Sequence, residues 1–257
     1  MSQTTVPPDA VPQADTTVTV SSVPPKGLVT RLVGVITSPR DTFAAVVAHP
    51  QWIGMALLVI LVTAGSGAWF QSTEVGKQAT LDEAIRQVEA FGMTVSGPME
   101  AEMRKGIMDP SLGRQVFSIA MMAIMPPIVW AVIAGLAMLV FGALMGGKGS
   151  FKQAFAVVVH SSAIGVIGAL VLTPVNYLRE SLTSATNLAV LMPFLPEGSF
   201  LARLLGMADI FRIWWVAVLA IGIGMAFQKK TRTVAFVLFG IYAVIAIGFA
   251  AFMAARS

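Results

Sequence analysis

The sequence predicts an all-α, multi-pass membrane protein built as a bundle of five transmembrane helices. Five long stretches of mostly apolar residues contain no Asp or Glu, and the chain of 257 residues is 56% hydrophobic but only 12% charged. Soluble domains are about 25% charged, whereas a helix of about 20 apolar residues spans the ~30 Å hydrocarbon core of a bilayer. The predicted spans are residues 52–70, 116–145, 154–178, 210–227 and 233–254.

The first 25 residues predict a disordered cytoplasmic tail. They are rich in Pro, Thr and Ser, and they contain no Lys or Arg. They also have no apolar core of the kind that a secretion signal or a membrane anchor needs. Residues 26–257 are therefore interpreted as one membrane domain.

The positions of the basic residues predict the orientation in the membrane. Two short loops, residues 146–153 and 228–232, are basic and contain no acid. Short loops rich in Lys and Arg stay on the cytoplasmic side. Five spans satisfy this rule when the N-terminus is cytoplasmic and the C-terminus external. Lys229, Lys230 and Arg232 are then candidates for contact with anionic lipid headgroups.

Amphipathic segments flank the spans. Residues 26–49 predict two short helices that meet near Ser38 and lie on the cytoplasmic leaflet, with Pro39 in the first turn of the second,. On the external side we expect one helix capped at Thr80 and another that runs from Ser96 to Asp109. The loop after the third span predicts an interfacial or re-entrant segment at 188–195 and a capped helix at 199–206,.

Few residues in the spans could carry chemistry. His160 is the clearest ionisable side chain inside a span, and it precedes Ser161. It is a candidate proton relay, ligand contact or protease base, but a histidine that is simply hydrogen-bonded between helices is the more frequent case. Two histidines without an acid in the spans, and no cysteine, predict neither a metal site nor a cofactor. No catalytic residue is assigned.

Two adjacent prolines, Pro126 and Pro127, are predicted to kink the second span and to form a hinge or a cavity,. The alternative is a static bend. A cavity at this kink would be lined by polar side chains of the third span, and the candidates are His160, Ser161, Thr173 and Asn176.

The order of several short motifs resembles the Yip1 domain family. These are a Pro-x-x-x-Phe pattern from Pro39, a Pro-x-Trp pattern from Pro50, the sequence GGKGSF at 146–151, and a Trp-bearing fourth span that is followed by a basic turn. The resemblance covers about residues 30–254. It implies five spans, a cytoplasmic N-terminus and an external C-terminus. Eukaryotic members act in membrane trafficking and contact Rab GTPases. The short tail here resembles the prokaryotic branch, which implies a bacterial inner membrane and no carry-over of Rab binding.

The leading functional hypothesis is a non-enzymatic scaffold or accessory factor for a membrane complex or for membrane organisation. The expected partners are membrane lipids and either a second protein or further copies of this chain, and no nucleic acid, because the basic residues are scattered through loops. The alternative is a small-molecule or lipid-handling transporter or channel with a cavity near Pro126, Pro127 and His160. An intramembrane hydrolase is disfavoured, because no span offers a nucleophile motif such as Gly-x-Ser-x-Gly.

Overall fold

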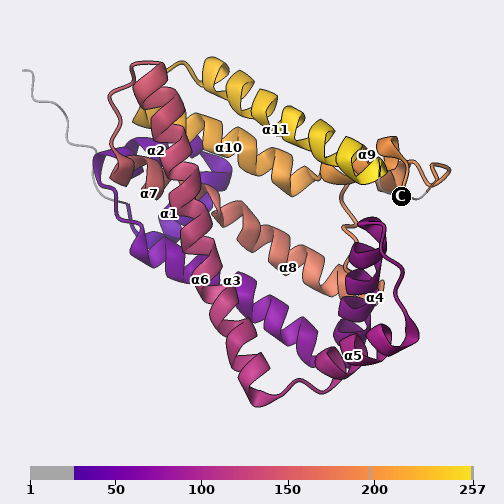
Figure 1. Cartoon of the computed structure of the whole chain (residues 1–257). Coiled ribbons are helices and arrows are strands. Elements are labelled where there is room, and N and C mark those ends of the chain that lie inside the picture. The colour runs from indigo at the N-terminus through magenta and orange to yellow at the C-terminus, as the bar shows by residue number, and fades with distance from the viewer. Residues whose placement is uncertain (1–25, 197, 256–257) are drawn as a thin grey trace, which may run out of the picture.

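The computed structural model describes residues 26–196 and 198–255, which form helices joined by loops (Figure 1). An isolated bridge between Asn187 and Asp209 is the one strand-like contact in this described part. The all-α class is therefore confirmed there, while the predicted tail lies outside the described residues. In chain order the helices are α1 (Leu28–Thr37), α2 (Pro39–Ala48), α3 (Ile53–Ser72), α4 (Glu74–Ala90), α5 (Gly97–Met108), α6 (Leu112–Ala137), the π-helix η1 (Met138–Leu144), α7 (Phe151–Ser161), α8 (Ala163–Leu178), the 3-10 helix η2 (Leu188–Leu191), α9 (Phe200–Met207), α10 (Ile210–Ala226) and α11 (Thr231–Ala254).

Four helical segments of the described chain are long and apolar enough to cross a membrane. They are α3, α6 with η1, α7 with α8, and α11. All four run between the same two ends of the molecule, here called the α2 end and the α4 end, and α10 runs beside them (Figure 1). Helix α10 has 17 residues, which corresponds to about 25 Å. Four predicted spans are thus confirmed as candidate spans, and the fourth in sequence is a shorter apolar helix.

The third predicted span is divided at Ser162. Helix α7 ends at Ser161, and α8 begins at Ala163. The hydroxyls of Ser161 and Ser162 donate hydrogen bonds of 2.9 and 3.0 Å to the carbonyls four residues earlier. Such side-chain bonds compete with the backbone and bend helices. Two consecutive serines that bond in this way therefore account for the division.

The prolines of the second span do not break it. Helix α6 continues from Leu112 through Pro126 and Pro127 to Ala137, and the irregularity comes later, in η1. Proline removes a backbone donor, but membrane helices tolerate it because neighbouring groups satisfy the freed carbonyls. The helix is therefore continuous through both prolines. A hinge at Pro126 and Pro127 stays a prediction.

The N-terminal helices pack differently from the prediction. They do meet near Ser38, but the apolar face of α2 is covered by protein, since Phe43 and Val46 are fully buried and α2 packs on α7 and α10. The reason is a close fit at Gly222 of α10, where a Cβ atom would lie 2.9 Å from the Phe43 ring. Small residues on α10 leave room for this ring, so α2 is part of the bundle.

The first of the two helices between the first and second spans begins earlier than predicted. Helix α4 is capped by Thr73, whose Oγ1 accepts a hydrogen bond from the amide of Gly76. The expected cap, Thr80, lies inside the helix and donates to the Gly76 carbonyl. A Cβ at Gly76 would lie 1.8 Å from the carbonyl oxygen of Phe70. Glycine is thus required where α4 folds back over the end of α3. Helix α5 ends next to Asp109, as predicted.

The loop between α8 and α10 is organised by Asp209. Its carboxylate accepts hydrogen bonds from the hydroxyls of Ser184 (2.6 Å) and Thr186 (2.5 Å) and from the amides of Phe211 and Arg212 at the start of α10. Burial alone raises the pKa of Asp209, but these four donors outweigh it, and the net pKa lies below the ordinary value,. The predicted helix at 199–206 is present as α9, with Ser199 as its cap.

Candidate functional site

A buried polar contact joins α1 to α7 near the α2 end. Arg31 is only 8% exposed and His160 is fully buried. Nη1 of Arg31 lies 3.3 Å from Nε2 of His160 and donates a hydrogen bond of 2.6 Å to the carbonyl of Gln51. Nδ1 of His160 lies 2.7 Å from the carbonyl of Ala156. Because a carbonyl only accepts, this geometry places the proton on Nδ1, and Nε2 of a neutral imidazole accepts from Arg31.

The guanidinium of Arg31 is held by neutral acceptors. Among the described residues no carboxylate forms an ion pair with it, and its Nε has no partner. Burial lowers the pKa of Arg31 from its ordinary value,. A hydrogen bond to a charged group contributes about 1.5–3 kcal/mol. Since both ring nitrogens of His160 are engaged, the contact is suited to fixing α1 against α7.

The four polar residues predicted to line one site do not come together. His160 and Ser161 are buried in α7, where the Ser161 hydroxyl donates to the carbonyl of Val157. Thr173 and Asn176 lie half-buried on α8, about 20 Å or more of helical rise from His160. Oδ1 of Asn176 is buried without a hydrogen-bond partner. A single site made from all four residues is therefore absent.

A groove of about 420 Å³ lies among α3, α6, α8 and α10, beside the first of the two prolines. None of the four predicted polar residues lines it. Pro126 and Ser162 do, and Asp209 and Arg212 lie at its α4 end. Its remaining walls are aliphatic, aromatic or very small: Val59, Trp130, Gly165, Gly168, Ala169, Leu172, Phe211 and Trp215. Such walls accommodate an apolar chain.

The three basic residues predicted to contact lipid differ in their surroundings. Lys229 is half-buried, and its Nζ donates a hydrogen bond of 2.5 Å to the carbonyl of Met145, which follows η1. It thereby ties the loop after α10 to the loop before α7. Lys230 and Arg232 are exposed at the α2 end. Lys148 lies in the neighbouring loop, so positive charge gathers there.

Two motifs of the resemblance, the Pro-x-Trp pattern and the GGKGSF loop, lie at the α2 end as packing residues. Trp52 meets Phe155 edge to face, with ring centroids 5.0 Å apart. In the GGKGSF loop, a Cβ at Gly147 or Gly149 would lie 2.8 Å from side-chain atoms of Phe227. Only glycine permits that approach without displacement. These residues position the helices, and the glycine loop packs tightly against Phe227.

The contact between Arg31 and His160 was not predicted from the sequence. One signal was available. Arg31 shares a helical face with Leu28 and Val35, at spacings of three and four residues,. An arginine in the middle of an apolar face points inward with that face. Its partner on α7 is 129 residues away, which no local pattern reveals.

The fold and these contacts define a helical, multi-pass membrane domain whose loops and N-terminal helices pack at one end. A family model described as the Yip1 domain matches residues 33–253. The chain therefore belongs to the Yip1 domain family. A search of curated proteins found no match, and a search of solved structures found none either.

Proposed function

We propose that this chain is a non-enzymatic membrane scaffold or accessory factor, which contacts a protein partner through the α4–α5 pair. The carrying observation is that α4 packs on α3 and α5 while the pair exposes Phe91, Met93 and Met99 among charged residues. Exposed apolar side chains on a water-facing surface mark contact sites, and methionine adapts to varied partners. A second copy of the chain is an alternative occupant of this surface.

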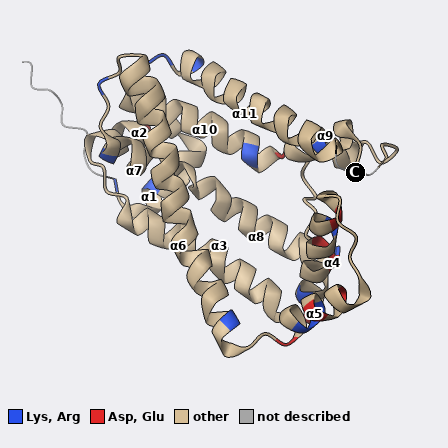
Figure 2. Ribbon diagram, viewed as in Figure 1, with Lys and Arg blue, Asp and Glu red and all other residues tan. Residues whose placement is uncertain are grey.

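The distribution of charge supports a cytoplasmic α2 end. Among the described residues, every acid except Asp41 lies at the α4 end, whereas the loops at the α2 end are basic (Figure 2). By the positive-inside rule the N-terminus is cytoplasmic and the C-terminus external. Helix α10 then serves as a fifth span of about 25 Å, which local thinning of the bilayer accommodates. A bacterial inner membrane remains our proposal for the location.

Helix α1 adds a lipid contact at the cytoplasmic side. Val29 and Val33 are 70% and 49% exposed, while Arg31 between them points inward. An apolar outer face with an inward arginine fits a helix that rests in the headgroup region. Lys230 and Arg232 lie at the same end and would contact anionic headgroups.

The scaffold proposal is tested by capture of partners from the native membrane. The tagged full chain is purified in a mild detergent beside a variant with Phe91, Met93 and Met99 changed to Ser. We expect a stoichiometric partner, or a second copy, with the parent and its loss with the variant. A control changes Gln78 and Arg86 of α4 to Ser and should retain the partner. If parent and variant recover the same proteins, α4–α5 is not the contact surface.

A second candidate function, lipid handling, is favoured by the groove beside Pro126. A Cβ at Gly165 meets no atom within 4 Å, so a larger side chain there would enter the groove without disturbing its walls. Gly165→Leu is expected to displace a bound acyl chain. Gly248→Leu is the control, because Gly248 on α11 is exposed and also has open space. Equal lipid content in the two variants would exclude an occupied groove. His160→Leu should affect stability instead.

A further inference from the structure

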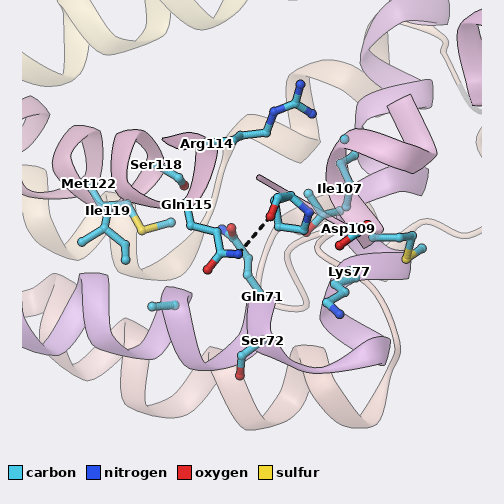
Figure 3. Close-up of a pocket in the computed structure, with 15 residues that line it drawn as sticks. Gln71, Ser72, Lys77, Ile107, Asp109, Arg114, Gln115, Ser118, Ile119 and Met122 are labelled. Carbon is cyan, nitrogen blue, oxygen red and sulfur yellow. Dashed lines mark hydrogen bonds between the residues drawn. The ribbon is translucent and has the colours of Figure 1, made fainter. Parts of the chain in front are cut away.

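A second cavity lies at the α4 end, where α3 and α4 meet α5 and the start of α6. Its volume is about 540 Å³. Figure 3 shows Gln71 and Gln115 in the space between α3 and α6, with Ile119 and Met122 toward the spans and Lys77 and Asp109 on the opposite side. The lining thus changes from apolar to amide to charged along one direction.

Aromatic residues mark the membrane boundary beside this cavity. Trp69 near the end of α3 packs against Tyr177 near the end of α8, with ring centroids 5.6 Å apart. Trp and Tyr concentrate at the level of the lipid headgroups. Gln71 and Ser72 come two and three residues after Trp69, within the same turn of helix, so the polar part of the cavity lies at headgroup depth. Ile119 lies one turn of α6 deeper and is exposed.

Two cations, Lys77 and Arg114, are among the lining residues. The side chain of Lys77 is 22% exposed, and its Nζ lies 2.8 Å from a carboxylate oxygen of Glu74, which is 83% exposed and therefore competes weakly,. Arg114 forms no ion pair with a carboxylate of the described residues. A Cβ at Gly106 would lie 1.7 Å from Nη1 of Arg114. The guanidinium therefore rests on the bare backbone of α5, which holds it at the cavity.

Neutral donors and acceptors complete the lining. Nε2 of Gln115 donates a hydrogen bond of 2.9 Å to the carbonyl of Pro110 (Figure 3), which fixes its amide at the cavity wall. Gln71 and Ser118 add an amide and a hydroxyl on the facing helices. Amides and hydroxyls suit ester and glycerol oxygens, whereas Lys and Arg suit a phosphate.

We propose that this cavity binds the headgroup of an anionic glycerophospholipid, with the phosphate between Lys77 and Arg114 and an acyl chain along Ile119 and Met122. The charged lining residues are two cations, Lys77 and Arg114, and one carboxylate, Asp109, so the lining has a net positive charge. The site is separate from the groove beside Pro126 and from the exposed residues of the scaffold surface. The outcome of its test is therefore independent of both proposed functions.

The test compares lipid binding to the full chain by native mass spectrometry in detergent. Phosphatidylglycerol is titrated against diacylglycerol with the same acyl chains, which lacks the phosphate. Lys77→Gln with Arg114→Gln should weaken phosphatidylglycerol binding by about 10- to 30-fold, since each cation near a lipid phosphate contributes about fivefold. Diacylglycerol binding should not change.

The matched control is Arg86→Gln with Arg104→Gln. It removes the same number of positive charges at the α4 end, one from α4 and one from α5, but these side chains pair with Glu83 and Glu100 and do not line the cavity. We expect less than a twofold change. If both double variants lose the same affinity for phosphatidylglycerol, general surface charge explains the binding and the proposal is wrong. Unchanged affinity in the cavity variant would also overturn it. Displacement of the lipid by millimolar glycerol 1-phosphate would assign the cavity to a soluble phosphate compound instead, and would overturn the lipid assignment.

Discussion

The contact between Arg31 and His160 predicts a strong, measurable coupling between α1 and α7. Arg31→Met keeps the length of the side chain but leaves the carbonyl of Gln51 and Nε2 of His160 without a donor. A buried group left unsatisfied costs about 1–3 kcal/mol, while removal of a poorly solvated charge returns part of that. We expect a net loss of about 2 kcal/mol in the free energy of unfolding. His160→Leu leaves Nη1 of Arg31 with one acceptor, the Gln51 carbonyl, and should cost about the same.

The double variant distinguishes a real pair from two independent effects. Once His160 is Leu, Arg31→Met removes a guanidinium that has already lost one acceptor, and it places two apolar side chains together. The double variant should therefore lose about 2 kcal/mol rather than about 4, which is a coupling of about 2 kcal/mol, within the range for residues in contact. Unfolding in mild micelles can be followed by the fluorescence of the 5 tryptophans.

A distant pair provides the control. Thr173→Val combined with His160→Leu should be additive to within about 0.5 kcal/mol, because these residues are about 20 Å apart along the helix. A coupling between Arg31 and His160 of the same small size would refute the reasoning. It would mean that α1 is held by its apolar contacts alone and that the arginine is replaceable.

Three further predictions address the packing, the loop and the orientation. Gly222→Ala should destabilise by about 1–3 kcal/mol through overpacking, because its Cβ would lie 2.4 Å from Cγ1 of Val157, whereas Gly240→Ala, which has open space, should be neutral or slightly stabilising in the same unfolding assay. Asp209→Asn should lower the free energy of unfolding by about 1–2 kcal/mol at pH 7. Because the pKa of Asp209 is lowered in the folded protein, the stability that its carboxylate contributes is fully present above the unfolded pKa of ~3.9 and is lost as the pH falls through the folded pKa. Equal stability of the parent and the variant at neutral pH would contradict this prediction. The chain has no cysteine, so single-cysteine variants report orientation directly: Glu100→Cys should react with a membrane-impermeant maleimide in intact cells and Lys230→Cys only after the membrane is opened, and the reverse pattern would invert the topology.

The sequence predicted most of the helices because their signals are local. Apolar length located the spans, and the junction at Ser38, the cap at Ser199 and the end of α5 follow from short-range cap and proline rules. The start of α4 was missed because Thr73 and Thr80 are both acceptable caps, and only contact between Gly76 and the end of α3 decides between them. Local propensity cannot choose between two such starts when tertiary packing does.

The candidate site was harder to predict than the fold because its partners are far apart in sequence. The contact between Arg31 and His160 joins residues 129 positions apart, which no local pattern indicates. The grouping of His160 with Asn176 was wrong for a simpler reason, because 16 residues of helix correspond to about 24 Å. The groove beside Pro126 is lined both by bulky side chains, such as Trp130, and by very small residues, such as Gly165 and Gly168. Polar residues are easily identified in an apolar sequence. A cavity depends instead on how large and small side chains pack in three dimensions, which composition does not show.

The position of the family motifs constrains where functional differences can lie. Phe43, Trp52, Gly147 and Gly149 are engaged in packing at the α2 end, and a change at any of them would disturb the helices themselves. Such residues specify the fold. The surfaces that remain free to vary without cost to this packing are α4 and α5, the cavity beneath them and the groove along α8. Partner choice and lipid choice should therefore be altered by substitutions in those three places, while the α2 end keeps the bundle intact.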